Sequence, residues 1–259
     1  MNSMREGSLL RDSRTMFIRS LKLSFRSPSA IALALMMPAS ILAIFVYVFG
    51  GAMDLGGVSV ANYIVPGVIV LTILQSTPAI SVRLNNDMTK GVIDRFRTMP
   101  IAKASILVGH VTAAILQSII TAGIAICVSL LVGFRPQAGV TEWIIAVVII
   151  ILYIVMAMWL AVLIGVFAKT SEEASGYMQL IGVLPFLSSA FVPTETMPRV
   201  LRIVAENQPM TPIIDTVRAL LLSQHLATST LGMALIWCIS LAVVFCVSAL
   251  HIYKQKAAQ

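Results

Sequence analysis

The sequence predicts an all-α integral membrane protein with six membrane-spanning helices, because charged residues are scarce and are missing from six long stretches. Of its 259 residues, 58% are hydrophobic and 11% are charged, whereas soluble domains carry about 25% charged residues. So apolar a chain cannot give itself a charged exterior, and its main solvent must therefore be lipid. The charge-free windows are Ser27–Met53, Leu55–Val82, Ala104–Phe134, Trp143–Ala168, Ala174–Thr194 and Ala219–Tyr253.

Each window is long enough for one helical span. The shortest has 21 residues, and a helix crosses the bilayer core with about 20. The windows are continuously apolar rather than alternating, which favours helices over strands. We expect a single transmembrane domain over residues 1–259, with spans at about 29–49, 60–82, 104–132, 143–168, 174–192 and 231–253.

The distribution of Lys and Arg predicts the orientation. Six spans place both termini on one side, and 14 of the 18 basic residues fall on that side. The other side holds only Arg135, Arg199, Arg202 and Arg218. Cytoplasmic loops of membrane proteins are enriched in Lys and Arg, so both termini are expected in the cytoplasm. The net charge of +7 is explained in the same way, and no nucleic-acid partner is expected.

The segment 14–26 precedes the first span and predicts an amphipathic helix. Phe17, Ile18, Leu21 and Phe25 recur at helical spacing, and basic residues occupy the other faces. Such a helix lies in the interface beside anionic lipid. Its role as a lipid anchor and a mechanical role remain equally open.

The second half of the first inner loop, residues 87–100, predicts a short amphipathic helix. Val92, Ile93, Phe96 and Met99 form an apolar stripe, and Pro100 ends it. This pattern suits a helix that lies on the inner membrane surface and contacts a cytoplasmic partner. An ordinary basic loop is the equally open alternative.

The last outer segment, residues 193–229, is too long for a tight turn. It predicts two short helices, one starting at Pro198 and one at Pro212, since proline is favoured in the first helical turn. The second is more apolar, and we expect it to enter the membrane and return, as a re-entrant element.

The chain lacks the residues that would let it supply its own energy. It has no G-x-x-x-x-G-K-[ST] phosphate-binding loop and no charged residue deep in a span of the kind that ion-driven transporters use. We interpret the three cysteines as packing residues; they are Cys127, Cys238 and Cys246. The three histidines do not cluster in the sequence. We therefore expect no catalytic, cofactor or metal site, with ATP and Mg²⁺ held by another polypeptide.

Three motifs carry a resemblance to a known family. They are Gly91-Val-Ile-Asp-Arg-Phe-Arg-Thr-Met-Pro100, Phe186-Leu-Ser-Ser-Ala-Phe-Val-Pro193 followed by Met197-Pro198, and Asn207-Gln-Pro-Met-Thr-Pro-Ile-Ile-Asp-Thr-Val-Arg218. In order and spacing they resemble type-2 ABC export permeases, especially the daunorubicin-resistance branch with its multidrug efflux and antibiotic resistance. The resemblance covers essentially the whole chain and implies an ABCG-like fold in a bacterial inner (plasma) membrane.

The resemblance also implies partners and site residues. Two permease copies, expected to form a homodimer, would sit on two cytoplasmic ABC ATPase subunits. The inner-loop helix would be the coupling helix, with Gly91, Asp94, Arg95, Phe96 and Arg97 as ATPase contacts. Many relatives carry Glu where Asp94 stands. The segment 14–26 resembles the family's connecting helix, and Asp215 and Arg218 lie in elements that resemble its extracellular gate.

In this family the second and fifth spans line the substrate path at the dimer interface. The candidate path residues here are Thr72, Gln75, Ser76, Met178, Gln179 and Phe186. Uncharged polar groups in apolar walls suit a small hydrophobic or amphiphilic substrate, although such side chains also bond helices to one another. Pro66, Pro78 and Pro185 could kink these spans.

We therefore expect the transmembrane permease subunit of an ATP-driven exporter of a drug, antibiotic or lipid-like compound. Three alternatives remain: a permease of the same fold that exports a polysaccharide or peptide, a membrane-embedded enzyme, and a non-transporting sensor or immunity protein. The lack of clustered ionisable residues argues against the enzyme.

Overall fold

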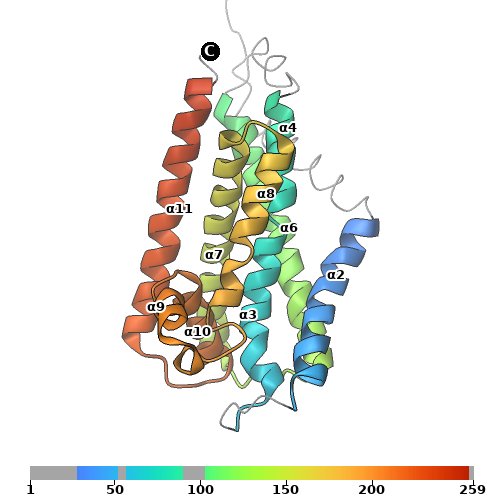
Figure 1. Ribbon diagram of the computed structural model, residues 1–259, viewed down its shortest axis with the longest axis vertical. Helices are drawn as coiled ribbons and strands as arrows, with labels where there is room; N and C mark the ends of the chain where they lie inside the picture. Colours follow the sequence, from blue (N-terminus) through green and yellow to red (C-terminus); the bar gives the residue numbers. More distant parts are fainter. Residues whose placement is uncertain (1–27, 52–56, 90–102, 257–259) are drawn as a thin grey trace, which may run out of the picture.

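The computed structural model describes residues 28–51, 57–89 and 103–256, and these form an elongated bundle of helices (Figure 1). In chain order the long elements are α2 (Pro28–Ala43), α3 (Val60–Gln75), α4 (Pro78–Thr89), α6 (Lys103–Val132), α7 (Val140–Phe167), α8 (Ser171–Ile181) and α11 (Thr228–Lys256). The short helices α9 (Arg199–Glu206) and α10 (Met210–Leu221) lie between α8 and α11. Residues 44–48 continue α2 with one wider turn.

Four helical stretches are long and apolar enough to cross a membrane. They are Val60–Thr89, Val111–Val132, Val140–Phe167 and Thr228–Lys256, and a shorter apolar helix covers Leu35–Val48. The prediction of an all-helical membrane protein is thereby confirmed over the described residues.

The second predicted span, 60–82, is divided into α3 and α4 by a break at Ser76 and Thr77. Ser76 donates its hydroxyl to the Ile73 carbonyl at 2.6 Å, and Thr77 donates to the Leu74 carbonyl at 2.5 Å. These side chains compete with the helix for its own backbone acceptors. Pro78, which starts α4, has no amide to continue the ladder. Pro66, by contrast, lies inside α3, which continues to Gln75.

The fifth predicted span, 174–192, is not one helix either. Helix α8 ends at Ile181, a single helical turn covers Leu184–Leu187, and Ser188–Pro193 is irregular. Gly182 and Pro185 both weaken a continuous helix at this point. The absence of charge predicted an apolar crossing segment, but it carries no information about whether the helix is continuous.

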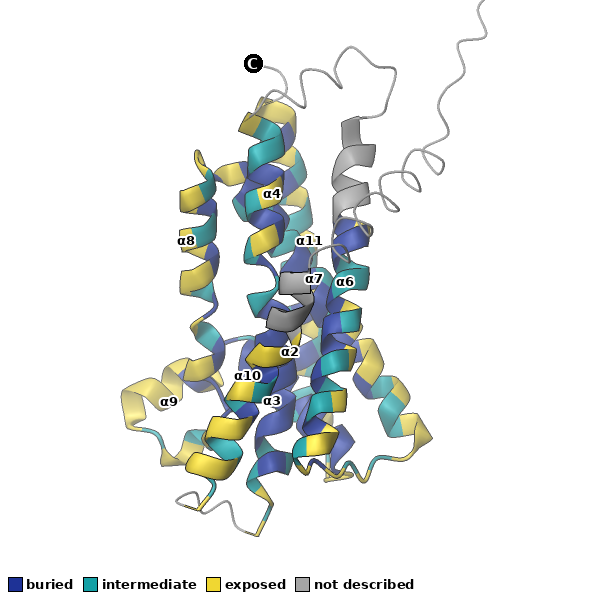
Figure 2. Cartoon of the chain, turned by 90° about the vertical axis from the view of Figure 1, so that its right-hand side faces the viewer, coloured by how far each residue is buried: buried dark blue, intermediate teal, exposed yellow. Residues whose placement is uncertain are grey.

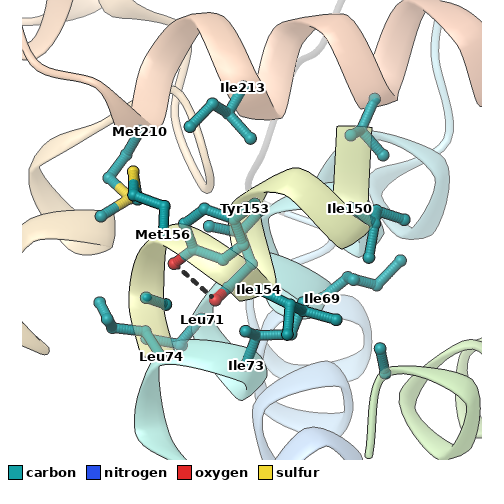
Figure 3. Close-up of a cluster of buried hydrophobic side chains, with 14 of the residues drawn as sticks. Ile69, Leu71, Ile73, Leu74, Ile150, Tyr153, Ile154, Met156, Met210 and Ile213 are labelled. Atoms are coloured by element: carbon teal, nitrogen blue, oxygen red, sulfur yellow. Dashed lines mark hydrogen bonds between the residues drawn. The ribbon is translucent and has the colours of Figure 1, made fainter. Parts of the chain in front are cut away.

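Helix α3 is the centre of the bundle. It contacts α2, α6, α7 and α10, and its residues from Ile64 to Leu74 are all buried. Tyr153 of α7 is fully buried and donates its hydroxyl to the Val70 carbonyl at 3.2 Å, among the aliphatic side chains of α3, α7 and α10 (Figure 3). This bond satisfies the one polar group that the tyrosine brings into the core.

The two short helices gather at the end of the bundle opposite the C-terminus (Figure 1). Helix α10 starts at Met210, two residues before the predicted Pro212, and is buried against α7, α11 and α3. Helix α9 starts directly after Pro198 and is almost entirely exposed (Figure 2). The ends of α4 and α11 and the start of α8 lie at the end with the C-terminus.

Candidate functional site

Arg218 of α10 lies at the centre of a polar cluster. The side chain is 7% exposed. Its Nε donates to the Tyr63 carbonyl at 3.0 Å, Nη1 to the Asp215 carboxylate at 2.5 Å and Nη2 to the Ser189 carbonyl at 2.5 Å. The guanidinium also lies 3.9 Å from the centre of the Tyr63 ring, which is cation–π distance. One side chain thus joins α3, α10 and the irregular segment after α8.

Asp215 completes this cluster. Its Oδ1 accepts a hydrogen bond from the Ser189 hydroxyl at 2.7 Å as well as from Arg218. The side chain is 37% exposed and reaches a pocket of about 410 Å³. The pocket is lined by polar and apolar residues of this end of the bundle, including Glu195, Gln224, His225, Leu226 and Thr230.

The predicted gate residues are therefore brought together, and they form a fixed connection. Every nitrogen of the Arg218 guanidinium has an acceptor within this chain, and one of these acceptors is the Asp215 carboxylate. Removing Asp215 would leave the buried Arg218 charge without its counterion, which destabilises a protein. Sequence reasoning placed Asp215 and Arg218 in this region but missed Tyr63, whose backbone carbonyl gives no signal in a sequence.

Four of the six predicted path residues fall into two groups. Thr72 and Met178 are buried, 4% and 1% exposed, and Thr72 donates to the Val68 carbonyl of its own helix. Gln179 and Phe186 are exposed, on the same segment as the exposed apolar residues Leu180 and Val183. In this arrangement only the second group lies on the surface.

Ser76 and Gln75 lie at the break between α3 and α4. The Ser76 hydroxyl is 3.2 Å from that of Ser118 on α6, which makes it an inter-helix contact. Gln75 faces the other break, because a Cβ added to Gly182 would lie 3.3 Å from the Gln75 Oε1. The interruptions of α3–α4 and of α8 therefore adjoin each other. Non-helical backbone at membrane depth is tolerated where protein buries it or where it lines a cavity.

Three aromatic rings connect the segment after α8 to the first helix. Phe186 stacks on Phe191 with ring centres 5.2 Å apart, and Phe191 stacks on Phe45 at 4.4 Å. At the same level, Gly67 of α3 touches Ala190, and an added Cβ would lie 2.6 Å from the Ala190 Cβ. The segment 186–191 is therefore packed tightly on its inner side and exposed at Phe186.

The predicted coupling residues Gly91, Asp94, Arg95, Phe96 and Arg97 lie outside the described residues, as does the segment 14–26. Their roles stay predictions. Of the predicted coupling loop 87–100, the part that is described belongs to α4, which ends at Thr89.

The described residues contain no group of three or more His, Cys, Asp or Glu side chains that could hold a metal ion. The polar contacts found there include side-chain hydrogen bonds to backbone carbonyls, the Arg218–Asp215 and Arg202–Glu206 ion pairs, and hydroxyl bonds within helices. Several of these contacts hold neighbouring helices together.

Comparison with known proteins agrees with this reading. Residues 12–222 match the family described as ABC-2 type transporter. The chain is also 30% identical over 226 residues to the daunorubicin resistance ABC transporter permease protein DrrB1 of Streptomyces coeruleorubidus, covering 86% of this chain and 79% of that protein. The chain belongs to the ABC-2 type transporter family of membrane permeases, which carry no ATPase site of their own and work with an ATPase subunit.

Proposed function

We propose that this chain is the permease of an ATP-driven exporter that moves a hydrophobic or amphiphilic compound, such as a drug or antibiotic, out of a bacterial cell. The observation that carries the proposal is the similarity to a drug-resistance permease along 86% of the chain. The exposed surface of the segment from α8 to Leu187 supports it, because Leu180, Val183 and Phe186 present uncharged apolar groups suited to an apolar substrate.

The proposed topology has both termini in the cytoplasm, following the distribution of basic residues. Helix α2 is then the first crossing, and α8 with Leu184–Leu187 is the broken fifth crossing. Helices α9 and α10 and the 410 Å³ pocket face the outside. The segment 90–102, between α4 and α6, faces the cytoplasm.

Two permease copies would pair with two ATPase subunits, with Asp94, Arg95, Phe96 and Arg97 in contact with the ATPases. ATP binding draws the ATPases together, and each moves its coupling helix. The permease then changes from an inward-facing to an outward-facing state. Work is delivered only because the nucleotide-bound ATPases interact differently with these two states.

The test uses inside-out membrane vesicles from cells that produce the chain together with the ATPase that co-purifies with it. Daunorubicin serves as the probe, and its fluorescence reports accumulation. Accumulation that requires ATP, and that a non-hydrolysable ATP analogue does not support, is expected. Equal accumulation in vesicles with and without the chain would exclude this class of cargo.

A further inference from the structure

The C-terminal end of α7 has backbone carbonyls that its own helix leaves unpaired. Ala168, which follows the helix, has extended backbone with φ −60° and ψ 147°. The amide of Lys169, which would be the helical partner of the Gly165 carbonyl, donates instead to the Glu173 carboxylate at 3.0 Å. The last carbonyls of a helix need partners from elsewhere.

Side chains from two other helices provide these partners. Asn85 of α4 donates from Nδ2 to the Gly165 carbonyl at 3.1 Å and to the Ala168 carbonyl at 2.8 Å. Lys256 of α11 donates from Nζ to the Val166 carbonyl at 2.7 Å. Both protons of the Asn85 amide are used, and the lysine places a positive charge at the negative end of the α7 dipole.

The burial of Asn85 shows what an amide contributes at this position. Asn85 is 1% exposed, and its Oδ1 has no hydrogen-bond partner among the described residues. An unsatisfied buried oxygen is unfavourable. An apolar residue at this position would avoid the unsatisfied oxygen, but it would leave the Gly165 and Ala168 carbonyls without donors. We therefore attribute the presence of an amide here to its two Nδ2 donors.

Two further contacts join α4 to the corner between α7 and α8. The α4 and α7 backbones touch at Gly165, where an added Cβ would lie 2.7 Å from the Ser81 carbonyl oxygen. Ser171, the first residue of α8, donates its hydroxyl to the Asn86 Oδ1 at 2.9 Å. Thr170 caps α8 by accepting from the Glu173 amide. The junction of Asn85, Asn86, Gly165, Ser171 and Lys256 is called the inner junction below.

We propose that Asn85 is a positioning residue that makes α4, the end of α7 and the start of α8 move as one unit. Helix α4 ends at Thr89, directly before the segment 90–102. The inner junction then passes a displacement of that segment to α8, whose outer face carries Gln179 and leads to Phe186. This inference rests on the proposed function, in which the ATPase acts on the segment 90–102. Its physical basis is a contiguous set of hydrogen bonds and backbone contacts.

The test measures distances between spin labels in the full complex, reconstituted with the ATPase that co-purifies with the chain. Cys127, Cys238 and Cys246 are first replaced by serine. One pair of labels, Arg83→Cys with Glu172→Cys, spans α4 and α8. A second pair, Glu172→Cys with Gln224→Cys, spans α8 and the outer end. All three positions to be labelled, Arg83, Glu172 and Gln224, are exposed. Distances are recorded without nucleotide and after trapping with ATP and vanadate.

The proposal predicts that the α4–α8 distance is narrow and equal in both states, while the second distance shifts on trapping. In Asn85→Leu the α4–α8 distribution broadens and the nucleotide-dependent shift is lost, although the complex still hydrolyses ATP. Asn85→Asp, similar in size but without donors when ionised, behaves in the same way. Asn85→Gln, which keeps both donors, recovers part of the shift. Thr89→Val is the matched control, because the Thr89 hydroxyl bonds only carbonyls of its own helix.

A purely structural role would lower thermal stability and leave the nucleotide-dependent shift intact, and that result would overturn the proposal. So would an α4–α8 distance in Asn85→Leu as narrow as in the parent protein. If no ATPase co-purifies, the proposed function fails separately. The distribution of α4–α8 distances in the isolated permease then tests whether the inner junction is rigid: a narrow distribution in the parent protein that broadens in Asn85→Leu supports it. If Asn85→Leu is not recovered from membranes, Ser171→Ala, which removes the Asn86 bond at a half-buried position, serves in its place.

Discussion

The cluster of Tyr63, Ser189, Asp215 and Arg218, at the end proposed to face outward and called the outer cluster below, and the inner junction around Asn85 both hold segments together, but with different chemistry. The outer cluster connects α10 to α3 and to the segment after α8, and the inner junction connects α4 to the end of α7, in both cases through a side chain that donates hydrogen bonds to backbone carbonyls. The outer cluster uses a guanidinium with a carboxylate partner, whereas the inner junction uses a neutral amide and a lysine. The buried guanidinium of Arg218 depends on its counterion, whereas the neutral amide of Asn85 has no counterion to lose.

The largest effect is expected for Arg218→Leu. The substitution leaves the Tyr63 and Ser189 carbonyls without their donor and Asp215 without its counterion. Because Asp215 is partly exposed, we expect a loss on the order of 3 kcal/mol. Thermal unfolding in detergent measures it. Arg202→Leu, which breaks an exposed pair with Glu206 on α9, is the control and should leave the unfolding temperature unchanged. Equal losses of stability in Arg218→Leu and Arg202→Leu would show that the outer cluster contributes no more than an exposed ion pair.

Asn85→Leu should destabilise the protein less than Arg218→Leu. It opens two buried carbonyls but also removes an unsatisfied oxygen, so the net loss is about 1–3 kcal/mol. The same unfolding measurement applies, with Thr89→Val as reference. A larger loss of stability in Asn85→Leu than in Arg218→Leu would show that the inner junction contributes more to stability than the outer cluster.

Gly165→Ala and Gly67→Ala test the backbone contacts that accompany the two regions. An added methyl group would lie 2.7 Å from the Ser81 oxygen in the first case and 2.6 Å from the Ala190 Cβ in the second. Overpacking of this kind costs about 1–3 kcal/mol. Gly123→Ala on α6 is the matched control, because nothing lies within 4 Å of its added Cβ. Alanine there should be neutral or stabilising, given its better helix propensity. Tolerance of alanine at Gly165 would show that α4 and α7 can separate.

The smallest effect is expected for Ser118→Ala. The Ser76 hydroxyl keeps its bond to the Ile73 carbonyl after the Ser118 hydroxyl is removed. The loss should be about 1 kcal/mol or less. Thermal unfolding of Ser118→Ala beside Ser240→Ala, a serine on α11 that bonds its own helix, measures it. A loss as large as that of Asn85→Leu would place a third connection at the break between α3 and α4.

The sequence predicted the apolar helices well because span length and charge are properties of single segments. The absence of Asp, Glu, Lys and Arg from Trp143–Ala168 is enough to locate α7, and Pro78 indicated the interruption at the start of α4. Pro185 likewise indicated an interruption of the fifth span, whereas the end of α8 at Ile181, four residues earlier, had no signal in the charge pattern.

The connections between distant segments could not be predicted in this way. Asn85 lies 80 residues from Gly165, and Arg218 lies 155 residues from Tyr63. Their acceptors are backbone carbonyls, which every residue has. Motif resemblance therefore placed Arg218 at the outer end without its partners, and it gave no indication of Asn85. Thr72 was expected on the substrate path because it is polar and the resemblance gives that role to the second span; its side chain is 4% exposed in this chain.

The central claim is that an ATPase on a separate polypeptide drives this permease, and co-purification tests it most directly. The tagged chain is extracted from native membranes in detergent, and the eluate is assayed for ATP hydrolysis and subunit ratio. We predict an ATPase in roughly equal amount that is lost with Arg95→Glu combined with Phe96→Ala, and retained with Arg135→Glu near the end of α10. A stable permease that brings down no ATPase under these conditions would contradict the account.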